Sequence, residues 1–199
     1  SFVNALQWAI GLELFLLVDD PWRIFLTTDH PNGGPFYWYP HMIRLLMDKS
    51  FRKDMMQKIN QDALKYSSLP SLDREYTMYE IAIMTRAGPA KSLGLKDRGH
   101  LGAGACADIT VYENNPNYEA MFEKPEFVFK NGELIVKNGR IVKAVNGATH
   151  VARPTYDPAI EKQIKSYFED FHTMRMENFR LSDDEIVNGG RGSIIVQPT

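Results

Sequence analysis

The chain has 199 residues, of which 44% are hydrophobic and 24% charged, and its formal net charge is −2. This composition is typical of a chain that folds around a hydrophobic core. Because acidic and basic residues nearly balance and no basic block occurs, nucleic acid is a poor candidate partner. The single cysteine, Cys106, excludes an internal disulfide framework and fits a reducing, cytoplasmic compartment.

The N-terminal stretch, residues 2–18, carries apolar side chains almost all round, which predicts a buried or strongly packed helix. It lacks the basic region and the small-residue cleavage site of a signal peptide. Asn4, Gln7 and Glu13 interrupt it, and its apolar part is shorter than the about 20 residues of a membrane span, so we expect no membrane anchor. Because the chain opens inside a helical pattern without an initiator Met, we expect it to be a piece of a longer protein.

A short apolar run, Arg23 to Thr28, follows the Asp19-Asp20-Pro21 stop and contains β-branched residues. Its continuity predicts a strand covered on both faces, as in parallel α/β sheets. Apolar spacings then predict helices over residues 39–48, over residues 51–64, and from Ser71 to a break at Gly88-Pro89, with Ser71 or Asp73 as the cap of the last one.

From Lys96 onward, short β-rich runs alternate with turn residues. Asn131-Gly132 and Asn138-Gly139 predict tight turns between antiparallel strands. Because a sheet of so few strands is hardly stable alone, we expect these strands to pair with further strands. Asp157-Pro158 predicts the start of a last, amphipathic helix, and the tail from residue 189 is either a terminal strand or a docking arm.

The most unusual stretch is LTTDHPNGGPF, Leu26 to Phe36. It places Asp29 at the carboxyl end of the predicted strand, where the active sites of α/β proteins lie. An Asp before His-Pro also simply closes a turn or caps the next helix in many proteins. The five histidines form no HxH pair and no metal motif by themselves. The residues alone therefore indicate a site only weakly.

The whole pattern is more specific and resembles the amidohydrolase superfamily. There, a strand ending in Asp and its helices are followed by T-x-x-x-P-A-x-x-L-G-L and then by G-x-L-x-x-G-x-x-A-D. The matching residues here are, in order, Thr85, Pro89, Ala90, Leu93, Gly94, Leu95, Gly99, Leu101, Gly104, Ala107 and Asp108. Within the superfamily, the box from Thr27 to Phe36 is similar to the family of A-type subunits of formylmethanofuran dehydrogenases. The corresponding subunits of bacterial formyltransferase/hydrolase complexes are close relatives of that family.

This resemblance implies an α/β plus β fold. Residues 1–95, with the strand 23–28, are expected to form the C-terminal end of a TIM-like (β/α)8 metal-dependent hydrolase barrel. Residues 96–150 are expected to form part of a composite β-sandwich, and residues 151–199 a helical C-terminal extension. Because such a piece leaves sheet edges open, we expect self-association or locally rearranged strands.

The resemblance also implies an activity, the interconversion of formylmethanofuran with formate plus methanofuran in the one-carbon metabolism of methanogenesis. The family holds two zinc ions with an HxH pair, a carboxylated Lys, two further His and the Asp at the tip of the last strand. Only that Asp has a counterpart here, Asp29, as both metal ligand and catalytic base. We therefore expect this chain alone to bind no zinc and to be inactive.

The rest of the box is expected to bind substrate through His30, Asn32, Gly33 and Gly34, although a His held to the backbone by the turn is an equal alternative. The aromatic residues 36–39 contact either substrate or core. The implied partners are a methanofuran-type substrate, formate, further subunits of the complex, and among these a tungsten- or molybdenum-containing dehydrogenase subunit. The alternatives are another amidohydrolase, such as a cyclic amidase or an N-acyl deacylase, and a non-catalytic assembly module.

Overall fold

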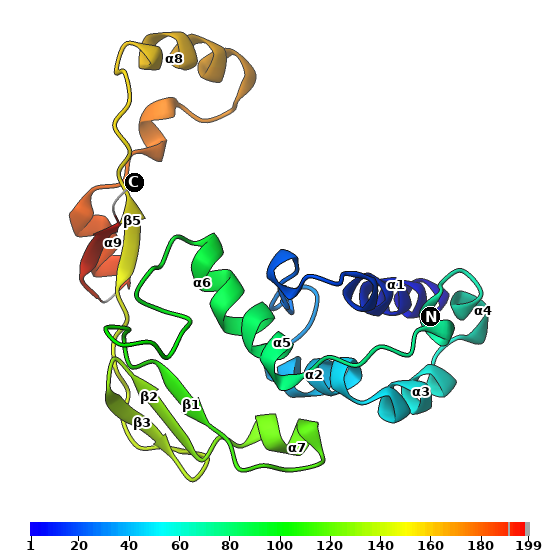
Figure 1. Ribbon diagram of the computed structural model, residues 1–199. Helices are drawn as coiled ribbons and strands as arrows, with labels where there is room; N and C mark the ends of the chain where they lie inside the picture. The colour runs from blue at the N-terminus through cyan, green and yellow to red at the C-terminus, as the bar shows by residue number, and fades with distance from the viewer. Residues whose placement is uncertain (191, 198–199) are drawn as a thin grey trace. The chain divides into compact units, whose positions relative to one another are not determined.

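The computed structural model describes residues 1–190 and 192–197, and Figure 1 shows its helices and strands. The chain divides into two compact units, Ser1–Ala144 and Val145–Thr199. Residues 96–144 cluster with the preceding helices in the first unit, and the three segments expected from the sequence stay a prediction.

The first 95 residues of the first unit are helical, joined by short 3₁₀ turns. The α-helices are α1 (Phe2–Leu17), α2 (Tyr39–Met47), α3 (Lys49–Lys58), α4 (Gln61–Leu64), α5 (Met78–Ala82) and α6 (Gly88–Ser92). The 3₁₀ turns are η1 (Pro21–Arg23), η2 (Phe36–Trp38) and η3 (Leu69–Ser71), and η4 (Ile83–Ala87) is a π turn. Their shared core is formed by Ala9, Leu12, Leu16, Leu26, Ile43, Leu45, Leu46, Met47, Met56, Leu69, Tyr76, Ile81 and Met84.

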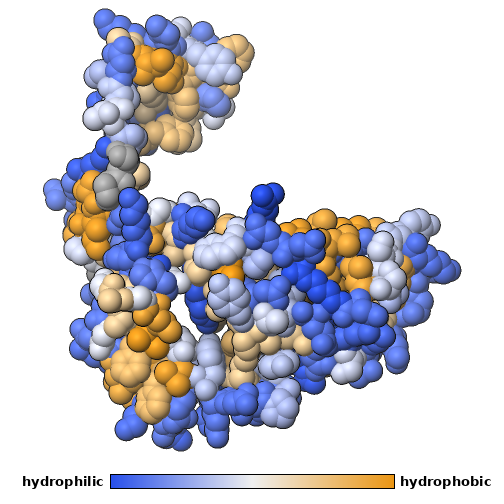
Figure 2. Space-filling model, viewed as in Figure 1, coloured by the Kyte–Doolittle hydropathy of each residue, from blue (hydrophilic) through white to orange (hydrophobic). Residues whose placement is uncertain are grey.

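Helix α1 confirms the first predicted helix but not its burial on all sides. Its buried residues, Ala5, Ala9, Leu12 and Leu16, recur at spacings of three and four and define one inner face. The opposite side leaves Val3, Ile10, Leu14 and Leu17 exposed. Figure 2 shows apolar side chains gathered over this helix. An uncovered face of this kind supports self-association, which stays a prediction.

The strand predicted over Arg23 to Thr28 is wrong for this structure. Arg23 ends η1, and the residues after it run extended but belong to no sheet, while Leu26 and Thr28 are buried. A strand needs a neighbouring backbone to exchange hydrogen bonds with, and none of the described residues supplies one. The two small sheets among the described residues accordingly close no barrel.

The third predicted helix begins seven residues later than Ser71. Leu69–Ser71 form η3, and no helix follows until α5 starts at Met78. Thr77 caps α5, because its Oγ1 accepts the Glu80 N–H at 3.2 Å while Glu80 Oε2 accepts the Thr77 N–H at 2.8 Å.

The predicted break at Gly88-Pro89 is also wrong. The helix passes this pair because η4 widens into a π turn between α5 and α6. Pro89 has no N–H to donate, and its ring would clash with the carbonyl four residues earlier in a regular α-helix. Pro89 lies in the first turn of α6, directly after the π turn, where a helix does not depend on the N–H that proline lacks.

A four-stranded antiparallel sheet completes the first unit. Its strands are β1 (Ile109–Val111), β2 (Phe127–Lys130), β3 (Glu133–Lys137) and β4 (Arg140–Ile141), in that order across the sheet, with α7 (Tyr118–Glu123) between β1 and β2. Both predicted Asn-Gly turns are confirmed. Asn131 and Gly132 have φ angles of 50° and 80°, as a two-residue hairpin turn with left-handed residues requires.

The second unit contains β5 (Thr149–Ala152), α8 (Ile160–Phe171), η5 (Met176–Phe179), α9 (Asp183–Gly190) and β6 (Ile194–Gln197). The predicted amphipathic helix is confirmed as α8, which starts at Ile160 after a turn in which Asp157 Oδ1 accepts the Ala159 N–H at 2.9 Å. Its expected place as the last helix is wrong, because α9 follows it. The tail is a terminal strand, since β6 pairs in parallel with β5; residues 191, 198 and 199 lie outside the described residues. Among the residues that the structure describes, no helix has the length and apolar character to cross a membrane.

Asp108, the last residue of the G-x-L-x-x-G-x-x-A-D pattern, anchors the start of the sheet. Its Oδ2 atom accepts hydrogen bonds from Arg98 Nη1 at 2.7 Å and from Lys130 Nζ at 2.6 Å, and its Oδ1 atom accepts the Asn131 N–H at 2.9 Å. Burial alone would raise the pKa of Asp108, but the hydrogen bonds from Lys130 and Asn131 and the charge of Arg98 lower it overall. The motif therefore ties β1 to the turn after β2.

The lowered pKa predicts a pH dependence of stability. The contribution of Asp108 is complete above its ordinary pKa of 3.8 and is lost as the pH falls through the lower pKa of the folded state. We expect Asp108→Asn to remove this dependence and to cost about 1.5–3 kcal/mol at neutral pH, the usual strength of charged hydrogen bonds. Urea unfolding between neutral pH and about pH 3 measures both effects. An acid dependence equal to that of wild type in this variant would contradict the assignment.

Gly99, from the same pattern, explains how the loop after α6 lies so close to the helix. Its φ of 77° is in the left-handed region. A Cβ atom there would lie 2.7 Å from Ala90 Cβ and 3.0 Å from Ala87 Cα, closer than real Cβ contacts. Glycine is thus required both for the backbone angle and for the space.

Candidate active site

The loop that carries Asp29 is a tight turn closed by backbone hydrogen bonds. The Asp29 N–H donates to Thr27 Oγ1 at 3.2 Å, and the Gly33 N–H donates to the Asp29 carbonyl at 2.8 Å. Asp29 itself has a φ of 49°, a left-handed conformation that Asp adopts more readily than most residues. Thr28 is buried beneath the turn, whereas Asp29 is exposed.

The side chain of Asp29 does not have either of the purely structural roles that were open from the sequence. The turn is closed through the backbone of Asp29, and the next element, η2, is preceded by Pro35 without a side-chain cap. Within residues 1–190 and 192–197, the carboxylate has no hydrogen bond and no ion pair. The exposed position of Asp29 leaves its carboxylate open to a ligand.

The other residues of the box lie around this turn. His30 packs edge-on against Phe36, with ring centroids 5.3 Å apart, and its ring makes no hydrogen bond within the described part of the chain. Asn32 is exposed, and so are the aromatic residues Phe36, Tyr37 and Trp38. Because Phe36, Tyr37 and Trp38 are exposed, they remain candidates for contact with substrate rather than core residues. Tyr39 instead packs against the core.

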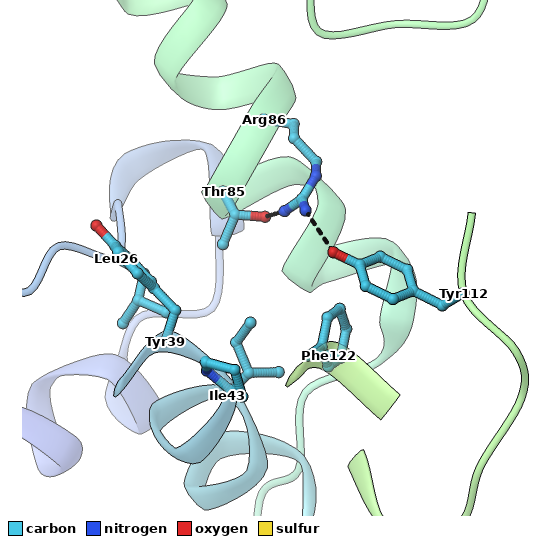
Figure 3. Close-up of a pocket in the computed structure, with 8 residues that line it drawn as sticks. Leu26, Tyr39, Ile43, Thr85, Arg86, Tyr112 and Phe122 are labelled. Carbon is cyan, nitrogen blue, oxygen red and sulfur yellow. Dashed lines mark hydrogen bonds between the residues drawn. The ribbon is translucent and has the colours of Figure 1, made fainter. Parts of the chain in front are cut away.

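A separate pocket of about 330 Å³ lies between the helices and the sheet of the first unit (Figure 3). Its lining residues are Leu26, Tyr39, Pro40, Ile43, Thr85, Arg86, Tyr112 and Phe122. Arg86 reaches Thr85 Oγ1 at 2.5 Å and the Tyr112 hydroxyl at 3.3 Å. Of the residues considered from the sequence, Tyr39 lines it, whereas Asp29, His30, Asn32, Gly33 and Gly34 do not. Arg86 was not among the residues predicted from the sequence, although it directly follows the motif residue Thr85.

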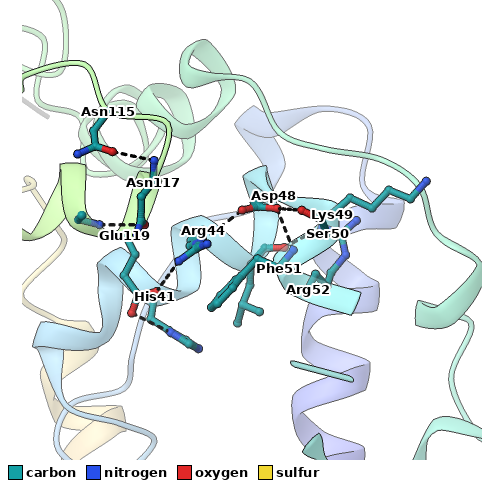
Figure 4. A network of polar contacts seen from close by, with 12 residues as sticks. His41, Arg44, Asp48, Lys49, Ser50, Phe51, Arg52, Asn115, Asn117 and Glu119 are labelled. Atoms are coloured by element: carbon teal, nitrogen blue, oxygen red, sulfur yellow. Dashed lines mark hydrogen bonds and ion pairs between the residues drawn. The ribbon is translucent and has the colours of Figure 1, made fainter. Parts of the chain in front are cut away.

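His41 belongs to a polar network that joins α2 to α7 (Figure 4). Its Nδ1 atom lies 3.1 Å from Glu119 Oε1, and Arg44 contacts both Glu119 at 3.6 Å and Asp48 at 3.3 Å. Burial would raise the pKa of Asp48, but the Phe51 N–H and Arg44 lower it overall. This network is structural, because every member holds a neighbouring helix.

The donor atoms at the turn fit only part of a metal centre. The part of the chain that the structure describes holds no group of three or more His, Cys, Asp or Glu side chains that could bind a metal ion. His100 instead bonds to the Lys96 carbonyl at 3.0 Å, and His150 bonds to Gln197 at 2.7 Å. The carboxylate of Asp29 fits one ligand position, so a metal centre at this turn needs further ligands from elsewhere.

Comparison with known proteins defines the class. The model of the amidohydrolase family matches residues 1–143, so the chain belongs to the amidohydrolase family. The predicted resemblance is also confirmed by particular relatives. The chain is 44% identical over 181 residues to the A-type subunit of the formyltransferase/hydrolase complex Fhc of Methylorubrum extorquens, covering 91% of this chain and 33% of that protein. It is 40% identical over 195 residues to "Protein FwdA" of Methanocaldococcus jannaschii, covering 92% of this chain and 34% of that protein.

A solved structure agrees with this assignment. The crystal structure of the formyltransferase/hydrolase complex FhcABCD from Methylorubrum extorquens with methylofuran matches all of this chain, with a TM-score of 0.84 and 41% identity. The match covers 37% of the chain in that crystal structure. The present chain thus spans about a third of the length of the relatives it matches.

Proposed function

We propose that this chain is part of an amidohydrolase subunit that interconverts formylmethanofuran with formate plus methanofuran. One observation carries the proposal: the exposed, unpartnered carboxylate of Asp29 on a turn closed by its own backbone. The relative crystallised as an FhcABCD complex with methylofuran supports a substrate of this kind. The zinc content, the remaining ligands and the activity of the whole protein are part of the proposal.

The roles assigned to the chain's own residues follow from general acid–base chemistry. A dinuclear zinc centre, with Asp29 as one ligand, would supply Lewis-acid polarisation of the formyl oxygen and a lowered water pKa. Asp29 takes one proton from the water that attacks the formyl carbon. It then passes that proton to the nitrogen as the carbon–nitrogen bond breaks, which leaves formate and the free amine.

The surroundings of Asp29 suit the binding of an aromatic substrate. The exposed rings of Phe36, Tyr37 and Trp38 offer stacking surfaces beside the turn. His30 packs on Phe36, and we assign substrate binding to His30, Asn32, Gly33 and Gly34, which follow Asp29 in the same turn.

The other subunits of the complex, including one that is a tungsten- or molybdenum-containing dehydrogenase, would use other surfaces. In the second unit, α8 leaves Ile160, Ile164, Tyr167 and Phe171 exposed along one stripe. This stripe is also what favours the second candidate function, a non-catalytic assembly module.

The test is formate release by the full-length protein, with a formylmethanofuran and a cyclic amide offered separately. We expect formate from the formyl amide, loss of activity after treatment with a chelator, and recovery when zinc is returned. If the protein opens only the cyclic amide, the amidohydrolase family still holds but the proposed substrate is wrong. Inertness towards both compounds in a zinc-loaded protein would favour the assembly module.

A further inference from the structure

The position of the Asp29 side chain is set by two neighbours in the same turn. On one side, the hydroxyl of Thr27 accepts the Asp29 N–H at 3.2 Å. On the other, the Gly33 N–H donates to the Asp29 carbonyl at 2.8 Å, which brings the backbone of Gly33 against that of Thr28 and Asp29. We refer to Thr27 and Gly33 as the Asp29 clamp.

The clamp has no room for a side chain at position 33. A Cβ atom built on Gly33 would lie 2.7 Å from the Thr28 carbonyl oxygen, 3.0 Å from Asp29 Cβ and 3.6 Å from Asp29 Oδ2. The φ of Gly33 is not in the left-handed region, so alanine is excluded by space and not by the backbone angle. Because Thr28 is buried, with only 7% of it exposed, the exposed Asp29 is the residue that would move.

The next residue provides a natural comparison. A Cβ atom on Gly34 would lie 3.5 Å from Trp38 Cε3 and 3.9 Å from the Thr28 carbonyl oxygen, both ordinary contact distances. The two adjacent glycines therefore have the same chemistry and different surroundings. Only Gly33 is in contact with the candidate base.

We propose that Thr27 and Gly33 are positioning residues that fix the Asp29 carboxylate for metal binding and proton transfer. This inference rests on the proposed function and gives Gly33 a role other than contact with substrate. The clamp acts by holding the backbone of Asp29 in its left-handed conformation, so its loss displaces the carboxylate while the exposed rings of Phe36, Tyr37 and Trp38 stay in place. A displacement of about 1 Å from the productive position lowers rates by about 10²-fold in enzymes.

The experiment uses the full-length protein and measures kcat, KM and bound zinc for each variant. We expect Gly33→Ala to lower kcat by about 10²-fold with little change in KM, and to retain less zinc than wild type. Gly34→Ala should retain zinc as wild type does. Thr27→Val removes the hydroxyl acceptor and should act like Gly33→Ala, while Thr27→Ser keeps the hydroxyl and should restore both kcat and zinc.

A double-mutant cycle separates positioning from a direct role. If Gly33 acts through Asp29, then D29N/G33A should be no less active and hold no less zinc than D29N alone. Additive losses in the double variant, or equal zinc retention by Gly33→Ala and Gly34→Ala, would overturn the proposal. If Gly33→Ala does not fold, the Thr27→Val and Thr27→Ser pair decides.

The same measurements distinguish failure of the proposed function from failure of the Asp29 clamp. A wild-type protein that releases no formate from the formyl amide contradicts that function. Zinc retention across the same variants still tests the clamp, since it does not depend on the substrate. Equal zinc retention by wild type, Gly33→Ala and Thr27→Val would then overturn it.

Discussion

Asp29→Asn is expected to lower formate release by about 10²–10⁴-fold, the usual contribution of a general acid–base group. Asparagine keeps the shape of the side chain, and the turn is closed by the backbone of residue 29, so the loop itself should be unchanged. What is lost is the negative charge of a metal ligand and the group that accepts the proton. The expected loss therefore falls on kcat and on zinc affinity, with little effect on folding.

The matched control for this change is Asp54→Asn. Asp54 is an exposed residue of α3, and its side chain makes no hydrogen bond or ion pair in the part of the chain that the structure describes. The same chemical change there should leave formate release as in wild type. Equal rates for wild type and Asp29→Asn would show that the LTTDHPNGGPF box has a structural role only.

Arg52→Met is expected to give the largest loss of stability, about 3–5 kcal/mol, because two carbonyls each lose a charged donor at about 1.5–3 kcal/mol. Arg52 is fully buried in the core. Its guanidinium donates to the Leu45 carbonyl at 2.7 Å and to the Arg74 carbonyl at 2.8 Å. Leu45 lies in the last turn of α2, where carbonyls lack helical donors and the helix dipole favours a cation.

Methionine would keep much of the volume of Arg52 but leave these carbonyls without a donor inside the core. The stability of Arg52→Lys should lie between those of wild type and Arg52→Met, because one ammonium group does not reproduce the planar fork of the guanidinium. Lys53→Met, on the exposed side of the same helix, should change stability by less than about 0.5 kcal/mol. Urea unfolding midpoints of the variants compare these values, and a midpoint for Arg52→Met equal to that of Lys53→Met would refute the assignment.

The sequence predicted best what depends on neighbouring residues. The Asn131-Gly132 turn is fixed by two residues that tolerate left-handed backbone angles, and it was predicted correctly. The cap formed by Thr77 and Glu80 is equally local, since the sequence shows the pattern T-x-x-E. The start of this helix was nevertheless predicted too early, because Leu72 and Tyr76 continue its apolar spacing toward the N-terminus.

What depends on distant partners could not be predicted in the same way. The run from Arg23 to Thr28 has the composition of a strand, but a sheet also needs a second backbone to pair with. Arg52 resembles an ordinary surface charge in the sequence KSFRKDMM, because the carbonyls that bury it come from other segments. The Asp29 box was recognised only as part of a family pattern, and the unpartnered carboxylate became visible only in the structure.

The π turn η4 has a consequence for how sequences of this family should be aligned. Its hydrogen bonds span one residue more than those of an α-helix, so Ile83–Ala87 contains in effect one additional residue. A protein lacking that residue would have a regular helix here and would align with a single gap inside the helix. Each residue turns a helix by about 100°, so such a protein would present a different face of α6 to the loop at Gly99. A difference of one residue at this position therefore distinguishes two ways in which the T-x-x-x-P-A motif packs. An alignment that ignores the gap would pair residues that do not correspond in space.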